Sequence, residues 1–152
     1  SAASDVYKRQ TYCLISIFMK NTHFGLLIIR VTIGLLMLPH GINKLVHPEA
    51  LVYITHLLEQ RGLPSAISYG VFIGEIIAPF FVLIGLRTRL SALVMVTTEF
   101  MVLFLAYSDN IFSLTEHGGW SVELPALFLF PALAVVIMGG GKYAISTKSK
   151  WD

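Results

Sequence analysis

Charged side chains stand inside stretches of this sequence that are otherwise apolar enough for lipid. Arg30, Glu75 and Glu99 lie well within such stretches, away from either end. A charge at the centre of a membrane helix costs about 2.5–3.5 kcal/mol on insertion scales, so each side chain is expected to face the interior of a helical bundle. The simplest hypothesis pairs Arg30 with Glu75, with Glu99 or with both.

Such a pairing has a structural interpretation and a chemical one. A buried ion pair can fix how helices align without taking part in any reaction. A buried carboxyl group can instead carry protons or face a bound quinone, and Glu75 is the candidate for that role. Glu99 can equally face a partner subunit. The residue pattern leaves structural and proton-relay roles open for Arg30, Glu75 and Glu99.

Polar and small residues form a stripe within the stretch "RVTIGLLMLPHGINKL". At 100° per residue, Arg30, Gly34, Gly41 and Lys44 fall on one side of a helix, with His40 at the edge of that side. The opposite side is apolar and consists of Leu27, Ile28, Leu35 and Leu38. The striped side is therefore expected to face the interior of the bundle.

A second group of polar side chains is expected near one end of the bundle. Glu123 follows Trp120 at the start of the last apolar stretch, and its estimated depth matches that of His40, about 3–5 Å inside the boundary. A cluster of His40, Lys44, Glu123 and Trp120 could form there. It would suit the carbonyl oxygens and flat ring of a quinone, or a purely structural network. Tryptophan at this depth is usually a membrane anchor.

The elements that position these residues follow from composition. Of 152 residues, 55% are hydrophobic and only 13% are charged, with a mean hydropathy of +0.73. One helical crossing needs about 20 apolar residues. Four stretches qualify, at residues 24–43, 66–86, 90–108 and 121–138. The sequence predicts an all-α integral membrane four-helix bundle in contact with the lipid bilayer.

The distribution of Lys and Arg predicts the orientation of this bundle. With four crossings, both termini and the second loop share one side. From Met19 onward that side carries Lys20, Arg87, Arg89, Lys142, Lys148 and Lys150, whereas the other side carries only Lys44 and Arg61. Positively charged loops favour the cytoplasm, so both termini are predicted to be cytoplasmic.

Several functions are disfavoured by what the sequence lacks. Cys13 is the only cysteine, so an internal disulfide or a cysteine metal cluster cannot form, and no metal site is predicted. The net charge of +2 and the absence of basic runs argue against nucleic acid as a partner. Residues 1–18 are interpreted as a non-native or disordered extension, with a true start at Met19. The alternative is that residues 12–18, "YCLISIF", extend the first helix. No covalently bound cofactor is expected.

Several short motifs of the sequence, in their order along the chain, resemble those of the DoxX family. The stretch "RVTIGLLMLPHGINKL" is followed by "RGLP", the mid-helix Glu75, "GLRTRLSAL", Glu123 and "GGGKYAI". The resemblance covers roughly residues 24–145 and suggests a DoxX-like membrane domain at 19–145 with a cytoplasmic tail at 146–152. It points to Arg30, His40, Lys44, Glu75, Arg89 and Glu123, without assigning any of them a catalytic role.

This resemblance implies a small multi-pass protein of a bacterial-type inner (plasma) membrane in a redox setting. Relatives are named for subunits of a terminal quinol oxidase, the similar DoxD proteins belong to a thiosulfate:quinone oxidoreductase, and others are linked to oxidative stress. The expected function is a small subunit of a quinone-linked redox system, with partner subunits or a homo-oligomer. The alternatives are a non-catalytic anchor for soluble redox enzymes and a small-solute or proton conduit.

Overall fold

The computed structural model describes the backbone of residues 2–152 and the side chains of residues 6–9, 11, 12 and 21–152. Within this described part, every regular element is a helix, and strand-like pairing is limited to one bridge between Leu114 and Trp120. The prediction of an all-α bundle is confirmed. The main helices are α1 (Ala2–Val46), α2 (Pro48–Gln60), α5 (Thr88–Ala106) and α6 (Glu123–Met138).

The second predicted crossing is helical throughout but changes its winding several times. It consists of a 3-10 turn (Ser65–Tyr69), α3 (Gly70–Phe72), a π-helical turn η2 (Ile73–Ile77) and α4 (Ala78–Ile84). Pro79 has no amide hydrogen to donate to the carbonyl four residues earlier, at Glu75. The amide of Ala78 bonds the carbonyl of Ile73, five residues back, as a π turn requires.

In the described part of the chain, three apolar helices are long enough to cross a membrane. They span Asn21–Val46, Ser65–Ile84 and Thr88–Ala106, while α6 is apolar but has 16 residues. Their outward faces carry exposed Leu, Ile and Phe side chains, as a lipid-facing surface requires. The molecule is therefore a membrane helical bundle.

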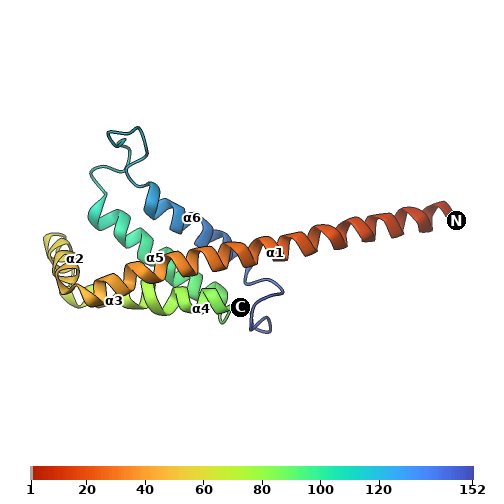
Figure 1. Ribbon diagram of the computed structural model, residues 1–152, viewed down its shortest axis with the longest axis horizontal. Helices are drawn as coiled ribbons and strands as arrows, with labels where there is room; N and C mark the ends of the chain where they lie inside the picture. Colours follow the sequence, from red (N-terminus) through yellow and green to blue (C-terminus); the bar gives the residue numbers. More distant parts are fainter. Residues whose placement is uncertain (1) are drawn as a thin grey trace.

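The helices form one bundle from which the first part of α1 projects (Figure 1). The lower half of this bundle pairs α1 with α4, and α5 packs along α6. We call the end that holds α2 and residues 107–122 the distal end, and the end that holds the turn at residues 85–87 the proximal end. Residues 139–152 follow α6 and return to the proximal end, where the amides of Ile145 and Ser146 bond the carbonyls of Ile84 and Gly85.

The expectation about residues 1–18 stays a prediction. The backbone of residues 2–18 continues α1, and only six side chains of this segment are described. The core of the bundle is apolar and includes Met37, Val82, Met95, Leu129 and Val135.

The predicted stripe on α1 faces the bundle, as expected. Arg30, Gly34 and Gly41 are buried and Lys44 is half-buried, whereas Ile28 and Leu35 are exposed. The glycines allow close approach: a Cβ at Gly34 would lie 2.8 Å from that of Leu83, and one at Gly41 would lie 2.7 Å from the carbonyl oxygen of Glu75. Small residues let membrane helices pack this closely.

This contact makes Gly41→Ala a sensitive substitution. The added methyl group would meet backbone atoms of Glu75, which cannot move without shifting η2, so we expect a loss of about 1–3 kcal/mol in the free energy of unfolding. The matched control is Gly25→Ala on the same helix, where a Cβ meets nothing within 4 Å. Unfolding with SDS, followed by circular dichroism, measures both variants. Equal stabilities would contradict the close approach at Gly41.

Candidate functional site

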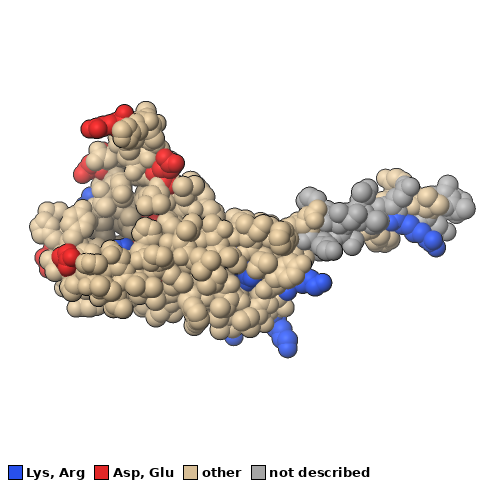
Figure 2. All heavy atoms as spheres, viewed as in Figure 1, with Lys and Arg blue, Asp and Glu red and all other residues tan. Residues whose placement is uncertain are grey.

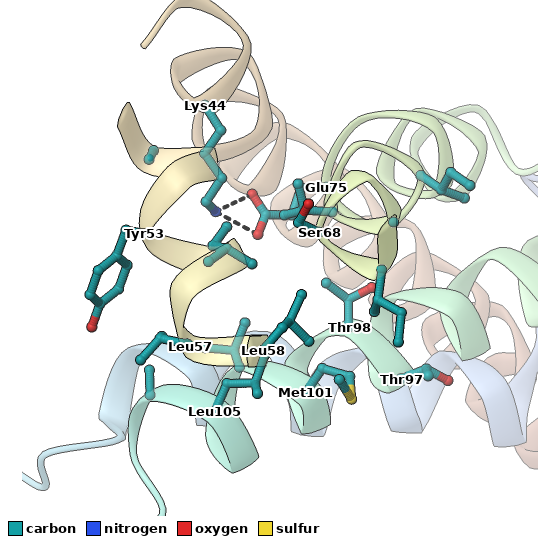
Figure 3. A pocket seen from close by; sticks show the side chains of 18 of the residues that line it. Lys44, Tyr53, Leu57, Leu58, Ser68, Glu75, Thr97, Thr98, Met101 and Leu105 are labelled. Atoms are coloured by element: carbon teal, nitrogen blue, oxygen red, sulfur yellow. Dashed lines mark hydrogen bonds and ion pairs between the residues drawn. The ribbon is translucent and has the colours of Figure 1, made fainter. Parts of the chain in front are cut away.

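An ion pair between α1 and η2 is the centre of the candidate site. The Lys44 ammonium donates to both carboxylate oxygens of Glu75, at 2.6 Å to Oε1 and 2.5 Å to Oε2. Glu75 is 3% exposed and the Lys44 side chain 23% exposed. Figure 3 shows the two side chains pointing toward each other. Both carboxylate oxygens are therefore satisfied by one cation.

The local sequence explains why these two residues meet. Gly41 and Lys44 are three residues apart, so they share one face of α1. Gly41 brings the backbone of α1 against the backbone of Glu75, and Lys44 then reaches the carboxylate about one helical turn further on. π-helical turns of this kind are frequent at functional sites. Here the turn carries Glu75.

A large cavity opens beside this ion pair. It measures about 570 Å³, within the usual size range of small-molecule sites, and it is bounded by α1, α2, the 3-10 turn, η2 and α5. Most of its lining is aliphatic (Figure 3), including Ile54, Leu57, Leu58, Val71, Met101 and Leu105. The lining side chains Ile67, Ile73 and Thr97 are also exposed on the lipid-facing surface, so the cavity is open toward lipid.

Polar groups are few on the lining of this cavity. The hydroxyl groups of Thr98 and Ser68 donate to backbone carbonyls of their own segments, at 3.0 Å and 2.7 Å. The Lys44–Glu75 pair is consequently the only charged feature that the cavity presents among the described residues. An apolar chamber with one polar end suits a ligand that has an apolar body and a polar head group.

A second, smaller cavity lies on the other side of the same ion pair. It measures about 120 Å³ and is shared by Lys44, Glu75, Glu99, His40 and Tyr107. Glu99 is 4% exposed. Throughout the described part of the chain, Glu99 has no hydrogen-bond or ion-pair partner. Two buried carboxyl groups therefore face one ammonium group.

The remaining predicted site residues do not form the expected cluster. The exposed His40 lines the small cavity, and its ring lies edge-on to that of Phe128 at 5.6 Å between centroids. Trp120 donates to the carbonyl of Ile111 at 2.6 Å within the distal loop, and Glu123 is exposed in the first turn of α6. Neither of them lines either cavity. Instead, the lining of the small cavity brings Lys44 and His40 together with Glu75 and Glu99.

The predicted pairing of Arg30 with a buried glutamate was wrong. In the part of the chain that the structure describes, Lys44–Glu75 is the only salt bridge. Arg30 lies at the proximal end, where its Nη2 donates to the carbonyl of Tyr143 at 3.1 Å. Its Nη1 packs against Gly85 at the end of α4, where helix carbonyl groups concentrate partial negative charge. Lys44, fourteen residues further along the same face, takes the place next to Glu75.

One contributor to the site was missed from sequence. The four predicted crossings leave residues 44–65 without an element, yet α2 forms there. Its side chains line the large cavity through Ala50, Tyr53, Ile54, Leu57 and Leu58. Their spacing of three and four residues is the pattern of an amphipathic helix and could have revealed it. Pro48 at the first position of α2 is a further start signal.

Comparison with known proteins places these features in a family. The sequence profile of the DoxX family matches residues 25–108, more than half of the chain, and this range contains Lys44, Glu75 and Glu99. An uncharacterized protein of Haemophilus influenzae is 27% identical over 89 residues, which cover 58% of this chain and 57% of that protein. The match thus spans less than two thirds of either chain. No solved structure matches the chain significantly. With its membrane helical bundle and this profile match, the chain belongs to the DoxX family.

Proposed function

We propose that this protein binds the head group of a membrane quinone beside Lys44 and Glu75, as a small subunit of a quinone-linked redox system. The observation that supports the proposal is the large apolar cavity, open toward lipid, with the Lys44–Glu75 ion pair at its polar end. The redox setting is what the resemblance to the DoxX family implies.

The lining residues fit such a ligand by their chemistry. A quinone supplies two-electron redox chemistry through a ring whose carbonyl oxygens accept hydrogen bonds. Lys44 carries three donor hydrogens, of which two serve Glu75, so a donor remains for a ligand oxygen. Leu57, Met101 and Leu105 exclude water from the ring and the tail. Glu75 holds the Lys44 ammonium in place through both of its carboxylate oxygens.

Charge at the two ends supports a proposed orientation. Acidic side chains gather at the distal end, and basic ones lie mainly at the proximal end and along the projecting part of α1 (Figure 2). The positive-inside rule then puts the proximal end and both termini in the cytoplasm of a bacterial-type inner membrane. The site is then nearer the outer face.

The test is to extract purified protein with organic solvent and identify co-purified quinone by mass spectrometry. We expect quinone near one equivalent in the natural protein. Met101→Trp, which fills the cavity and leaves the ion pair intact, should lose it. Leu127→Trp, placed on the exposed face of α6, should keep it and is the matched control.

Absence of quinone from folded natural protein would contradict the proposal. The anchor function would then be favoured, and the search would move to proteins that co-purify with the bundle. Equal quinone content in Met101→Trp and the natural protein would place the ligand outside this cavity. A flux assay in liposomes distinguishes the conduit function, which requires leakage above that of empty vesicles.

A further inference from the structure

The ion pair leaves one buried carboxyl group without a counter-charge. Glu75 takes both of its hydrogen bonds from Lys44, whereas Glu99 faces the same small cavity with no partner in the described part of the chain. If both carboxyl groups were ionised, the cluster would carry a net negative charge inside the membrane, which is costly. One bound proton removes that charge.

The groups that face Glu99 come from every element around the small cavity. Helix α1 contributes His40 and Lys44, η2 contributes Glu75, and Tyr107 caps the end of α5. Helix α6 contributes only the apolar Leu124, Pro125 and Phe128. Among the described residues that line the small cavity, Lys44 is thus the only permanent cation, and it is already held by Glu75.

The geometry also points to Glu99 rather than Glu75 as the proton carrier. A proton on Glu75 would remove an acceptor from the short bonds to the Lys44 ammonium, whereas a proton on Glu99 breaks no bond. The small cavity gives Glu99 a route to the distal end, since His40 lines this cavity and is itself exposed.

We infer that Glu99 is a positioning residue whose proton, exchanged with the solution past His40, keeps Lys44 available to the ligand. This inference rests on the proposed binding of a quinone in the large cavity. When Glu99 loses its proton, the second negative charge draws the Lys44 ammonium toward the small cavity and away from the ligand oxygen. Ligand binding therefore weakens as the pH rises.

The experiment measures binding of a benzoquinone carrying one isoprene unit to the full chain in lipid nanodiscs, from mildly acidic to alkaline pH. We expect the Kd of the natural protein to rise by up to about tenfold per pH unit once Glu99 ionises. Glu99→Gln keeps the shape and hydrogen-bonding capacity of the side chain but cannot ionise. Its Kd should match the low-pH value and stay flat.

Two further variants test whether a side chain other than Glu99 causes the pH dependence. Glu123→Gln removes an exposed carboxylate that lines neither cavity and should keep the natural pH profile. His40→Ala removes the imidazole that lines the small cavity, and its Kd is measured over the same pH range. A profile that flattens in His40→Ala but not in Glu99→Gln would assign the titration to His40 and overturn the inference.

The outcomes distinguish the inference from the function on which it rests. Binding that loses its pH dependence only in Glu99→Gln supports both. Binding with an unchanged pH profile in Glu99→Gln overturns the role of Glu99 and leaves the quinone site standing. Failure of the folded natural protein to bind at any pH overturns both. If Glu99→Gln does not fold, infrared spectroscopy of the natural protein decides: a protonated carboxyl band that shifts in deuterated water is expected, and its absence overturns the inference.

Discussion

Replacing Lys44 with methionine should lower the free energy of unfolding by about 3–5 kcal/mol, because it leaves Glu75 buried without its counter-charge. Glu75 is 3% exposed and takes both of its carboxylate hydrogen bonds from Lys44. Unfolding of the purified protein in SDS-containing micelles, followed by circular dichroism, measures the loss.

The double variant Lys44→Met plus Glu75→Leu makes this prediction specific. Removing both charges leaves no unpaired group, and replacing a buried ion pair by apolar side chains is often neutral or stabilising. We therefore expect the double variant to recover most of the lost stability. The matched control is Lys142→Met, which removes an exposed lysine at the proximal end. A Lys44→Met variant as stable as this control would refute the buried pair.

The second large effect is expected from Gly85→Ala, which should cost about 2–5 kcal/mol. Gly85 ends α4 with a φ of +78°, a conformation that strains any residue with a side chain. An added Cβ would also clash with the Arg30 guanidinium and would lie 2.6 Å from the Cα atom of Ala144. The methyl group therefore meets both a buried cation and the backbone that covers it.

Gly62→Ala separates the two causes of that loss. Gly62 has a similar φ of +68°, but nothing lies within 4 Å of its Cβ position. It therefore reports backbone strain alone, about 1–2 kcal/mol. The difference between the two variants in the same SDS titration measures the packing of Arg30 under residues 139–146. If the two variants lose equal stability, Arg30 and Ala144 do not pack closely against Gly85.

The residues tested by these variants belong to two polar centres of the bundle, and we expect the two centres to have different roles. The proximal centre holds Arg30 among helix ends and backbone carbonyls, and Arg30 lines neither of the two cavities beside Glu75. The distal centre holds Lys44, Glu75 and Glu99 between two cavities. Substitutions at the proximal centre should therefore affect folding, whereas those around the distal cavities should also affect ligand binding.

The sequence by itself determined the class of the protein and the buried face of its first helix. Long apolar stretches are dictated by the thickness of a membrane, and the burial of Arg30, Gly34 and Gly41 follows from helical periodicity. The start and end of α6 at Glu123 and Met138 also lie close to the predicted limits. These properties depend on neighbours along one helix, so the sequence contains them directly.

Only the tertiary structure decided which charges meet. An ion pair requires its atoms within about 4 Å, but a depth counted along an ideal helix is uncertain by about one turn of 5.4 Å and does not specify which helices are neighbours. The close approach at Gly41 and the π turn at Glu75 placed Lys44, rather than Arg30, beside that carboxylate. The cavity likewise depends on α2 folding against α5, a contact between segments far apart in the chain.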